Sequence, residues 1–296
     1  MRRILLLVAL AVAAFPPSAT ATAPRDPLTA DQFNAAVVPI AQRLHRKPVT
    51  AAPGQRISIA VFDKLVVKQV GLIDLGRSIQ AEATRAGLAP PARFGTEVVA
   101  RALGLHSNHP ASDDASELFP SDTITHAEAD YSFARLKSKS PGSFAYVRGL
   151  YDQFTLPAYT PEQQQALHVA VSKIGYPYIW GGESDTTSSR YGPQAHGGYD
   201  CSGFVWRVFK LSGDPAGAAI KGRTAAQMGT EIPRTQRVAY ADIAPTDLVF
   251  FGSPIYHVGI AMSDSFIIQS SNQGVNVGPL FENWRRADFA WARRVL

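Results

Sequence analysis

Helix-compatible segments dominate the first half of the chain. The pattern of apolar and polar positions predicts helices over residues 62–86, 94–103, 127–135 and 144–154. A capping-box pattern, Thr29 followed three positions later by Gln32, predicts a further helix start. Residues 105–125 are polar and contain two prolines, which favours a loop. Residues 24–159 are therefore predicted to form a mainly helical N-terminal region.

The pattern changes at Thr160. Thr160 and Pro161 predict the start of a helix that ends at Gly175, and a second helix is predicted from Asp200 onward. Between these helices, residues 183–198 are polar and predicted to form a long surface loop. Apolar runs typical of strands follow at 248–251, 257–262, 266–271, 275–277 and 291–295. A helix followed by an antiparallel sheet is an α+β arrangement.

The N-terminal residues resemble an export signal. Two arginines precede an apolar run at residues 4–15, which is shorter than the ~20 residues that a membrane span needs. Small residues follow, and we predict cleavage after Ala21. Residues 1–21 are therefore interpreted as a signal peptide, and the protein as secreted or periplasmic, at the cell wall. An uncleaved anchor is the alternative, and no stable membrane span is predicted elsewhere.

Composition and charge narrow the class of protein. Of the 296 residues, 46% are hydrophobic, which is ordinary for a globular protein with a full core. The formal net charge is +5, and it becomes +3 once the two leader arginines are removed. So mild an excess does not indicate nucleic-acid binding, which needs a dense basic stripe.

The chain has a single cysteine, Cys201, so it forms no intrachain disulfide. In an exported protein an odd cysteine indicates a reactive thiol or intermolecular pairing, and a small buried hydrophobe is the bland alternative. Cys201 falls in the first turn of a predicted helix. There the free backbone N–H groups and the helix dipole favour a thiolate, the nucleophile of acyl transfer. The same N–H groups can bind an oxyanion.

A base for this thiol is predicted on a strand. Alternation in residues 257–262 places His257 on the face opposite the core-facing Val258. If residues 263–265 form a three-residue turn, Gly259 pairs with Gln269, which then lies diagonally beside His257. A two-residue turn would put Gln269 on the opposite face. The alternatives are His196 as base, and Ser270, Ser271 or Asn272 in place of Gln269.

These motifs occur together in an order typical of one family. They are GYPYIWGG at 175–182, DCSGF at 200–204, RTAAQ at 223–227, DLVFF at 247–251, HVGI at 257–260 and ARRV at 292–295. Residues 160–296 thus resemble the NlpC family of papain-like cysteine peptidases, which are cell-wall endopeptidases. The resemblance implies a reduced papain-like core and cleavage of peptidoglycan stem peptides, typically between D-γ-glutamate and a diamino acid. It also implies that Tyr178 and Ser202 contact the oxyanion or substrate.

The chain departs from the family pattern in three places. Gln269 stands where the family often has histidine, although a neutral amide can also orient an imidazole. Thr246 stands where glycine is usual before Asp247, which concerns a turn. The loop 183–198 is longer than usual, which concerns substrate preference. Residues 24–159 lie outside the resemblance.

Several alternatives remain open at this point. Another thiol hydrolase on the same fold, a muramoyl-alanine amidase or a toxin-like hydrolase, and a non-catalytic wall-binding protein would share these motifs. The helical region could be a wall anchor, a module that docks a protein partner, or an inhibitory cover. We expect no metal or organic cofactor, because acyl transfer through a thiol and an imidazole requires neither. A metal site is also disfavoured because a His-x-x-His spacing does not fit a helical ligand pair. That spacing occurs in a polar loop with these metal-ligand residue types: His106, His109, Asp113, Asp114 and Glu117. Tryptophans are predicted to be core residues rather than the lining of a glycan groove: Trp180, Trp206, Trp284 and Trp291.

Overall fold

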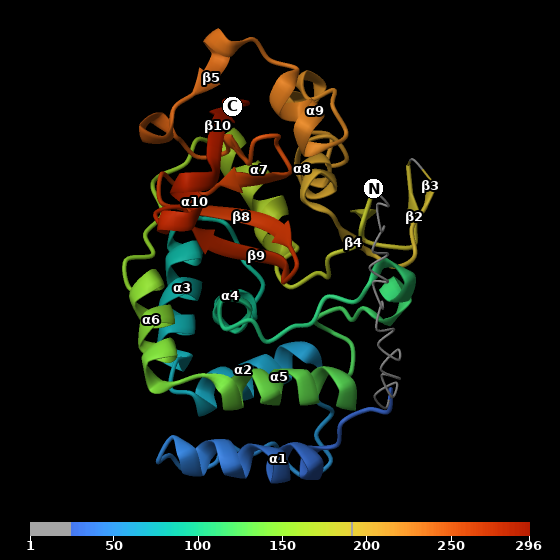
Figure 1. Cartoon of the computed structure of the whole chain (residues 1–296), viewed down its shortest axis with the longest axis vertical. Coiled ribbons are helices and arrows are strands. Elements are labelled where there is room, and N and C mark those ends of the chain that lie inside the picture. The colour runs from blue at the N-terminus through green and yellow to red at the C-terminus, as the bar shows by residue number, and fades with distance from the viewer. Residues whose placement is uncertain (1–24, 191) are drawn as a thin grey trace, which may run out of the picture.

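The computed structural model describes residues 25–190 and 192–296, so the predicted signal peptide lies outside the described residues. Helices make up the N-terminal part, in the lower half of Figure 1. They are α1 (Ala30–Arg43), α2 (Ile59–Gln69), α3 (Ile73–Arg85), α4 (Phe94–Ala102), α5 (His126–Ser138) and α6 (Pro141–Tyr151). A short 3₁₀ turn, η1 (Ala111–Ser116), interrupts the predicted loop. The predicted mainly helical character of this region is confirmed.

Two details of the helices test the sequence predictions. The capping box is present at the start of α1, where the Thr29 hydroxyl accepts the N–H of Gln32. The single helix predicted over 62–86 is wrong, because α2 ends at Gln69 and α3 begins at Ile73. Between them Gly71 has φ +79°, a left-handed conformation that ends a helix and that glycine adopts without steric cost.

Residues 160–296 have the expected α+β fold. The helices are α7 (Pro161–Ser172), α8 (Cys201–Phe209), α9 (Ala225–Thr230) and α10 (Asn283–Asp288), of which the last two were not predicted. An antiparallel sheet has the strand order β5-β10-β6-β7-β8-β9. Its strands are β5 (Arg237–Val238), β6 (Leu248–Phe251), β7 (His257–Ala261), β8 (Phe266–Ser271), β9 (Gly274–Pro279) and β10 (Phe289–Arg293). The predicted loop 183–198 contains two short ribbons, β1 (Glu183–Ser184) with β4 (Gly198–Tyr199) and β2 (Ser188–Ser189) with β3 (Gly192–Pro193).

Three shorter 3₁₀ segments complete the elements of this half: η2 (Pro215–Ala219), η3 (Arg234–Gln236) and η4 (Tyr240–Asp242). Thr246, noted for replacing a usual glycine, is fully buried and has φ +71°. A left-handed conformation is one that glycine adopts freely and a β-branched residue adopts only at a cost. The family's preference for glycine there thus has a backbone reason.

The helices and the sheet share one apolar core. A single cluster of buried side chains runs from Leu28 to Val277. At the junction the ring of Phe266 on β8 lies 5.8 Å from that of Tyr151 and 4.9 Å from that of Phe154. The chain boundary predicted at residue 160 therefore does not separate two independent cores, although its status as a domain boundary stays a prediction.

A buried arginine adds a polar link between the two halves. Arg101 on α4 is 6% exposed, and its Nε lies 3.2 Å from Oε2 of Glu97. Its guanidinium also donates to the carbonyl of Gly175 at 2.6 Å and to that of Gln273 in the β8–β9 turn. Within the described residues, no helix has both the length and the apolar character to cross a membrane.

Candidate active site

Cys201 is the first residue of α8, as predicted. The N-cap residue Asp200 accepts the N–H of Gly203, and this bond fixes the first turn of the helix. A Cβ at Gly203 would lie 1.9 Å from the carbonyl oxygen of Gly182. Glycine in this motif therefore lets the helix start pack against the Gly181–Gly182 backbone, and Cys201 is left 9% exposed.

Arg223 braces this helix start from the neighbouring loop. Its guanidinium pairs with Asp200 at 3.2 Å and Glu183 at 3.1 Å, and it donates to the hydroxyl of Ser202 at 3.0 Å. The Ser202 hydroxyl in turn donates to Asp200, and the residue is 4% exposed. The Ser202 hydroxyl, predicted to contact the oxyanion or substrate, is therefore held by Asp200 and Arg223, and the backbone N–H of the same residue interacts with the thiol.

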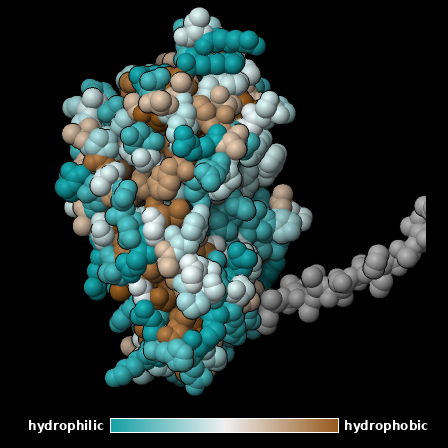
Figure 2. Space-filling model, turned by 60° about the vertical axis from the view of Figure 1, so that its left-hand side comes forward, coloured by the Kyte–Doolittle hydropathy of each residue, from teal (hydrophilic) through white to brown (hydrophobic). Residues whose placement is uncertain are grey.

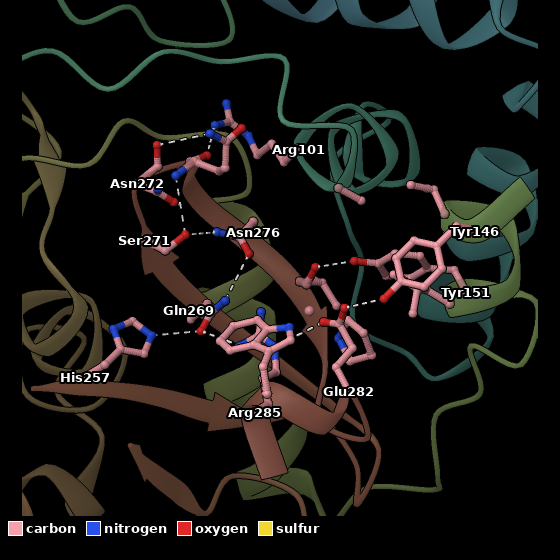
Figure 3. A pocket seen from close by; sticks show the side chains of 18 of the residues that line it. Arg101, Tyr146, Tyr151, His257, Gln269, Ser271, Asn272, Asn276, Glu282 and Arg285 are labelled. Atoms are coloured by element: carbon pink, nitrogen blue, oxygen red, sulfur yellow. Dashed lines mark hydrogen bonds and ion pairs between the residues drawn. The ribbon is translucent and has the colours of Figure 1, made fainter. Parts of the chain in front are cut away.

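His257 and Gln269 lie together as the three-residue turn predicted. Met262 donates its N–H to Phe266 at 2.7 Å and Ile260 pairs with Ile268, which is the register required. Nε2 of His257 lies 2.8 Å from Oε1 of Gln269, as Figure 3 shows. Because that oxygen only accepts, Nε2 carries the proton and Nδ1 is left as the basic nitrogen.

The direction of the Gln269 amide is set by two further residues. Arg285 donates from Nη1 to Oε1 of Gln269 at 3.3 Å, and Nε2 of Gln269 donates to Oδ1 of Asn276 at 3.2 Å. Asn276 donates in turn to the hydroxyl of Ser271 at 2.8 Å (Figure 3). A flipped Gln269 amide would place its NH₂ group against the guanidinium of Arg285, donor against donor. Arg285 and Asn276 therefore keep Oε1 of Gln269 directed at His257.

Sequence reasoning missed Asn276 and Arg285. Asn276 could have been found, because it is a polar residue between the core-facing Val275 and Val277 and directly opposite Gln269 in the register. Arg285 lies on the unpredicted helix α10 and carried no comparable signal.

One cavity of about 1270 Å³ brings the predicted catalytic residues together. Cys201, His257, Gln269 and Tyr178 all line it. His196, the rival base, does not, because its ring packs 4.7 Å from that of Phe119 and its Nδ1 bonds the Gly197 carbonyl. His257, and not His196, therefore lines the same cavity as Cys201.

Burial sets the charge state of this pair. It raises the pKa of the Cys201 thiol to about 11, with Asp200 acting in the same direction and three backbone N–H groups acting against it. Burial also lowers the pKa of His257, although the Gln269 hydrogen bond opposes the change. The thiolate predicted from the helix start is thus opposed by desolvation, and in the free pocket both groups are neutral at pH 7.

Tyr178 lies beside the thiol. Burial is the main cause that raises the pKa of its phenol, and proximity to Cys201 adds to the effect. The hydroxyl consequently keeps its proton at any working pH and is available as a donor.

A second titratable cluster lies away from the catalytic pair, among the N-terminal helices. Ligand atoms of Asp63, Glu97 and His106 lie within 4.8 Å of one another, and all three residues are buried. These residue types could hold a divalent cation, but Arg101 already supplies a positive charge to Glu97. Of the loop residues considered above, His106 alone takes part, and His109 pairs instead with Glu117 at 3.0 Å. We therefore describe the cluster as a buried network of titratable side chains, in which His106 bonds Asp63 at 2.9 Å and Arg101 pairs with Glu97.

Part of this chain is similar in sequence to known proteins. Residues 175–294 match the model of the NlpC/P60 family. A protein of Listeria grayi named "Probable endopeptidase p60" is 31% identical over 121 residues, which cover 40% of this chain and 20% of that protein. The "Murein DD-endopeptidase MepH" of Escherichia coli K12 is 31% identical over 159 residues, which cover 47% and 49%. The match thus spans half or less of these relatives.

Solved structures give the same family name. An NlpC/P60 family protein from Bacillus cereus is 24% identical, with a TM-score of 0.36, and the match covers 48% of this chain and 42% of that one. RipD of Mycobacterium tuberculosis, described as a non-catalytic NlpC/p60 domain protein adapted to peptidoglycan binding, is 23% identical with a TM-score of 0.36, and the match covers 47% and 100%. The resemblance to the NlpC family is confirmed for residues 175–294 by the family model.

Proposed function

We propose that this chain, whose residues 175–294 match the NlpC/P60 family, is a thiol endopeptidase that cleaves peptidoglycan stem peptides between D-γ-glutamate and a diamino acid. The observation that carries the proposal is the pocket shared by Cys201 and His257, with Gln269 bonded to the imidazole at 2.8 Å. The endopeptidase names of the relatives, one of them specific to murein, support the substrate class. The predicted signal peptide supports export to the cell wall.

Attack on the substrate begins from a neutral thiol and a neutral imidazole. As Sγ of Cys201 bonds to the peptide carbonyl carbon, its proton passes to Nδ1 of His257, so His257 acts as a general base. The carbonyl oxygen becomes an oxyanion, which the Tyr178 hydroxyl and the Cys201 backbone N–H bind. Gln269 keeps accepting from Nε2–H, which stabilises the imidazolium that forms.

Collapse of this intermediate releases the first product. His257 gives its proton to the leaving amine as the C–N bond breaks, and a thioester on Cys201 remains. Water then attacks the thioester carbonyl while His257 takes a proton from the water. As the C–S bond breaks, His257 returns this proton to Sγ of Cys201 and the acid product leaves. No step uses a metal or an organic cofactor.

Digestion of purified peptidoglycan tests the proposal. The protein comprising residues 22–296 is incubated with insoluble peptidoglycan, and the masses of soluble fragments are measured. An endopeptidase of this type releases fragments that begin with the diamino acid. Release of whole stem peptides beginning with L-alanine would identify an amidase instead. Sedimentation of the protein with the wall and no soluble fragment would identify a binding protein.

A further inference from the structure

The catalytic pocket continues well beyond Cys201, onto the N-terminal helices. Its volume of about 1270 Å³ exceeds the ~300–1,000 Å³ typical of a small-molecule site. Tyr146 on α6 lines it, together with Lys139 at the end of α5. The pocket is therefore large enough for more than the two residues on either side of a scissile bond.

Exposed aromatic rings gather around this pocket. Five large hydrophobic side chains are exposed among the described residues, and four of them line it. These four, which we name the aromatic rim, are Trp180 (77% exposed), Tyr256 (64%), Tyr146 (59%) and Trp284 (56%). Exposed apolar side chains that cluster at a concave site mark a binding surface, whereas scattered ones do not. Figure 2 shows hydrophobic patches among hydrophilic ones along one face of the molecule.

Three of the four rings are held by their neighbours. The Tyr146 hydroxyl donates to Glu282 at 2.9 Å, and the Tyr256 hydroxyl bonds Asp288. The guanidinium of Arg285 lies 4.4 Å from the centre of the Trp284 ring. The two phenol hydroxyls are thus bonded within the protein, while all three side chains stay exposed to solvent. Rings fixed in this way lose little conformational entropy when a ligand binds.

The pocket between the rings has a mainly apolar lining, into which a few polar and charged side chains are set. Amides of Asn272, Gln273 and Asn276 line it. Two of its charged groups, Arg285 and Glu282, are paired with each other at 3.5 Å. Aromatic faces beside amides suit a ligand with apolar C–H faces and a rim of hydroxyl and acetamido groups. That is the chemistry of an amino sugar, whose acetamido and hydroxyl groups can bond the exposed amide of Asn272.

We infer that the aromatic rim binds amino-sugar rings, so that the site takes stem peptides still attached to their glycan in preference to free peptides. This inference rests on the proposed function. Trp180 is two residues from Tyr178 and Tyr256 adjoins His257, so the rim borders the catalytic pair. A stem peptide spans ~3.3–3.6 Å per residue, which puts its sugar within about 10 Å of a bond two residues away.

The exposed positions of two tryptophans correct the predictions made for them. Trp180 and Trp284 were expected in the core, but they are exposed on the rim. Trp206, at 5% exposure, is buried, and Trp291 is half-buried against Arg237, with the guanidinium 3.5 Å from its ring centre. The helical region acquires a role as well, because Tyr146 belongs to it.

Binding and turnover together test the inference. The Cys201→Ala protein lacks the proposed nucleophile and so does not turn over a ligand. It is titrated with a tetramer of β-1,4-linked N-acetylglucosamine by calorimetry. We expect Trp180→Ala and Trp284→Ala, each added to Cys201→Ala, to raise Kd by about ten-fold or more. Phe281→Ala is the matched control, since Phe281 is 41% exposed and lies outside the pocket lining. A tetramer that does not bind, or binds all variants equally, would overturn the inference.

Turnover separates this inference from the proposed function. In the active protein we expect kcat/KM to be higher for a disaccharide-linked stem peptide than for the free peptide. Each tryptophan substitution should lower that ratio by about ten-fold. Equal kcat/KM for both substrates would contradict the sugar site while leaving the peptidase intact. Rim-dependent tetramer binding without cleavage of either substrate would support the sugar site and contradict the peptidase.

Discussion

The hydroxyl of Tyr146 donates a 2.9 Å hydrogen bond to the carboxylate of Glu282, 136 positions later in the chain. Tyr146 lies on α6 and Glu282 is the N-cap of α10, so the bond joins the helical region to the sheet side of the catalytic pocket. Anchor, partner-docking module and inhibitory cover were the roles open to the helical region. These contacts indicate a further one, in which the helices form a wall of the pocket that holds Cys201 and His257.

Removal of the helices tests that role. The aromatic contacts of Phe266 with Tyr151 and Phe154 would be lost in residues 158–296 alone, and each buried aromatic is worth ~3–5 kcal/mol. We expect this fragment to melt at a much lower temperature than residues 22–296, or to aggregate. A fragment that melts cooperatively at the same temperature and turns over stem peptides faster would instead identify a cover.

Substitutions at Gln269 test its role as the residue that orients His257. Gln269→Ala should lower kcat by about ten-fold, less than the ~10²–10⁴-fold expected for His257→Ala, because it removes orientation and leaves the base. Gln269→Glu should retain more activity than Gln269→Ala. Its carboxylate would raise the pKa of His257, which moves the rising limb of the pH–rate profile to higher pH. An unshifted profile for Gln269→Glu would contradict direct contact with the imidazole.

Gly259 provides a test of the space between the two residues. A Cβ at this position would lie 3.3 Å from Cβ of Gln269 and 3.1 Å from Cδ1 of Ile267. We expect Gly259→Ala to displace Gln269 from His257, and to lower kcat several-fold while costing about 1–3 kcal/mol of stability. Kinetics and urea denaturation measure the two effects. A variant with wild-type kcat would show that the strand pair has room for the methyl group.

The meeting of Cys201, His257 and Gln269 at one pocket could be predicted from sequence, because the determinants of their placement are local. A cap residue before Cys201 and strict alternation around His257 fix where the two side chains point, and turn length alone fixes the register with Gln269. The aromatic rim could not be predicted in this way. Tyr146 and Glu282 meet only through tertiary packing, and a tryptophan in a sequence carries no sign of whether its ring is buried or exposed.

The buried pair of Asp63 and Glu97 predicts a specific dependence of stability on pH. Burial raises the pKa of Asp63 from 3.8 to about 7, and Arg101 only partly opposes it. Between pH 3.8 and about 7, Asp63 keeps a proton in the folded protein that it releases in the unfolded chain. The stabilisation from Asp63 is therefore present at low pH and is lost as pH rises toward 7. His106, whose pKa burial lowers to about 4, acts in the opposite direction.

Asp63→Asn should therefore remove the contribution of Asp63 to stability, which falls as pH rises. Relative to wild type, we expect the variant to gain stability between pH 5 and pH 7.5, as measured by urea denaturation at both pH values. Asp31→Asn, an exposed substitution on α1, is the matched control. Parallel pH profiles for Asp63→Asn and wild type would show that Asp63 is ionised in the folded protein throughout.

The rate at which Cys201→Ala releases fragments from purified peptidoglycan tests whether Cys201 is the nucleophile of a peptidoglycan endopeptidase. The substitution replaces a thiol by a hydrogen at the start of α8 and leaves the cap at Asp200 in place. We predict an unchanged melting temperature within about 2 °C and a rate at least ~10³-fold below wild type. Residual release above a few per cent of the wild-type rate would contradict the assignment.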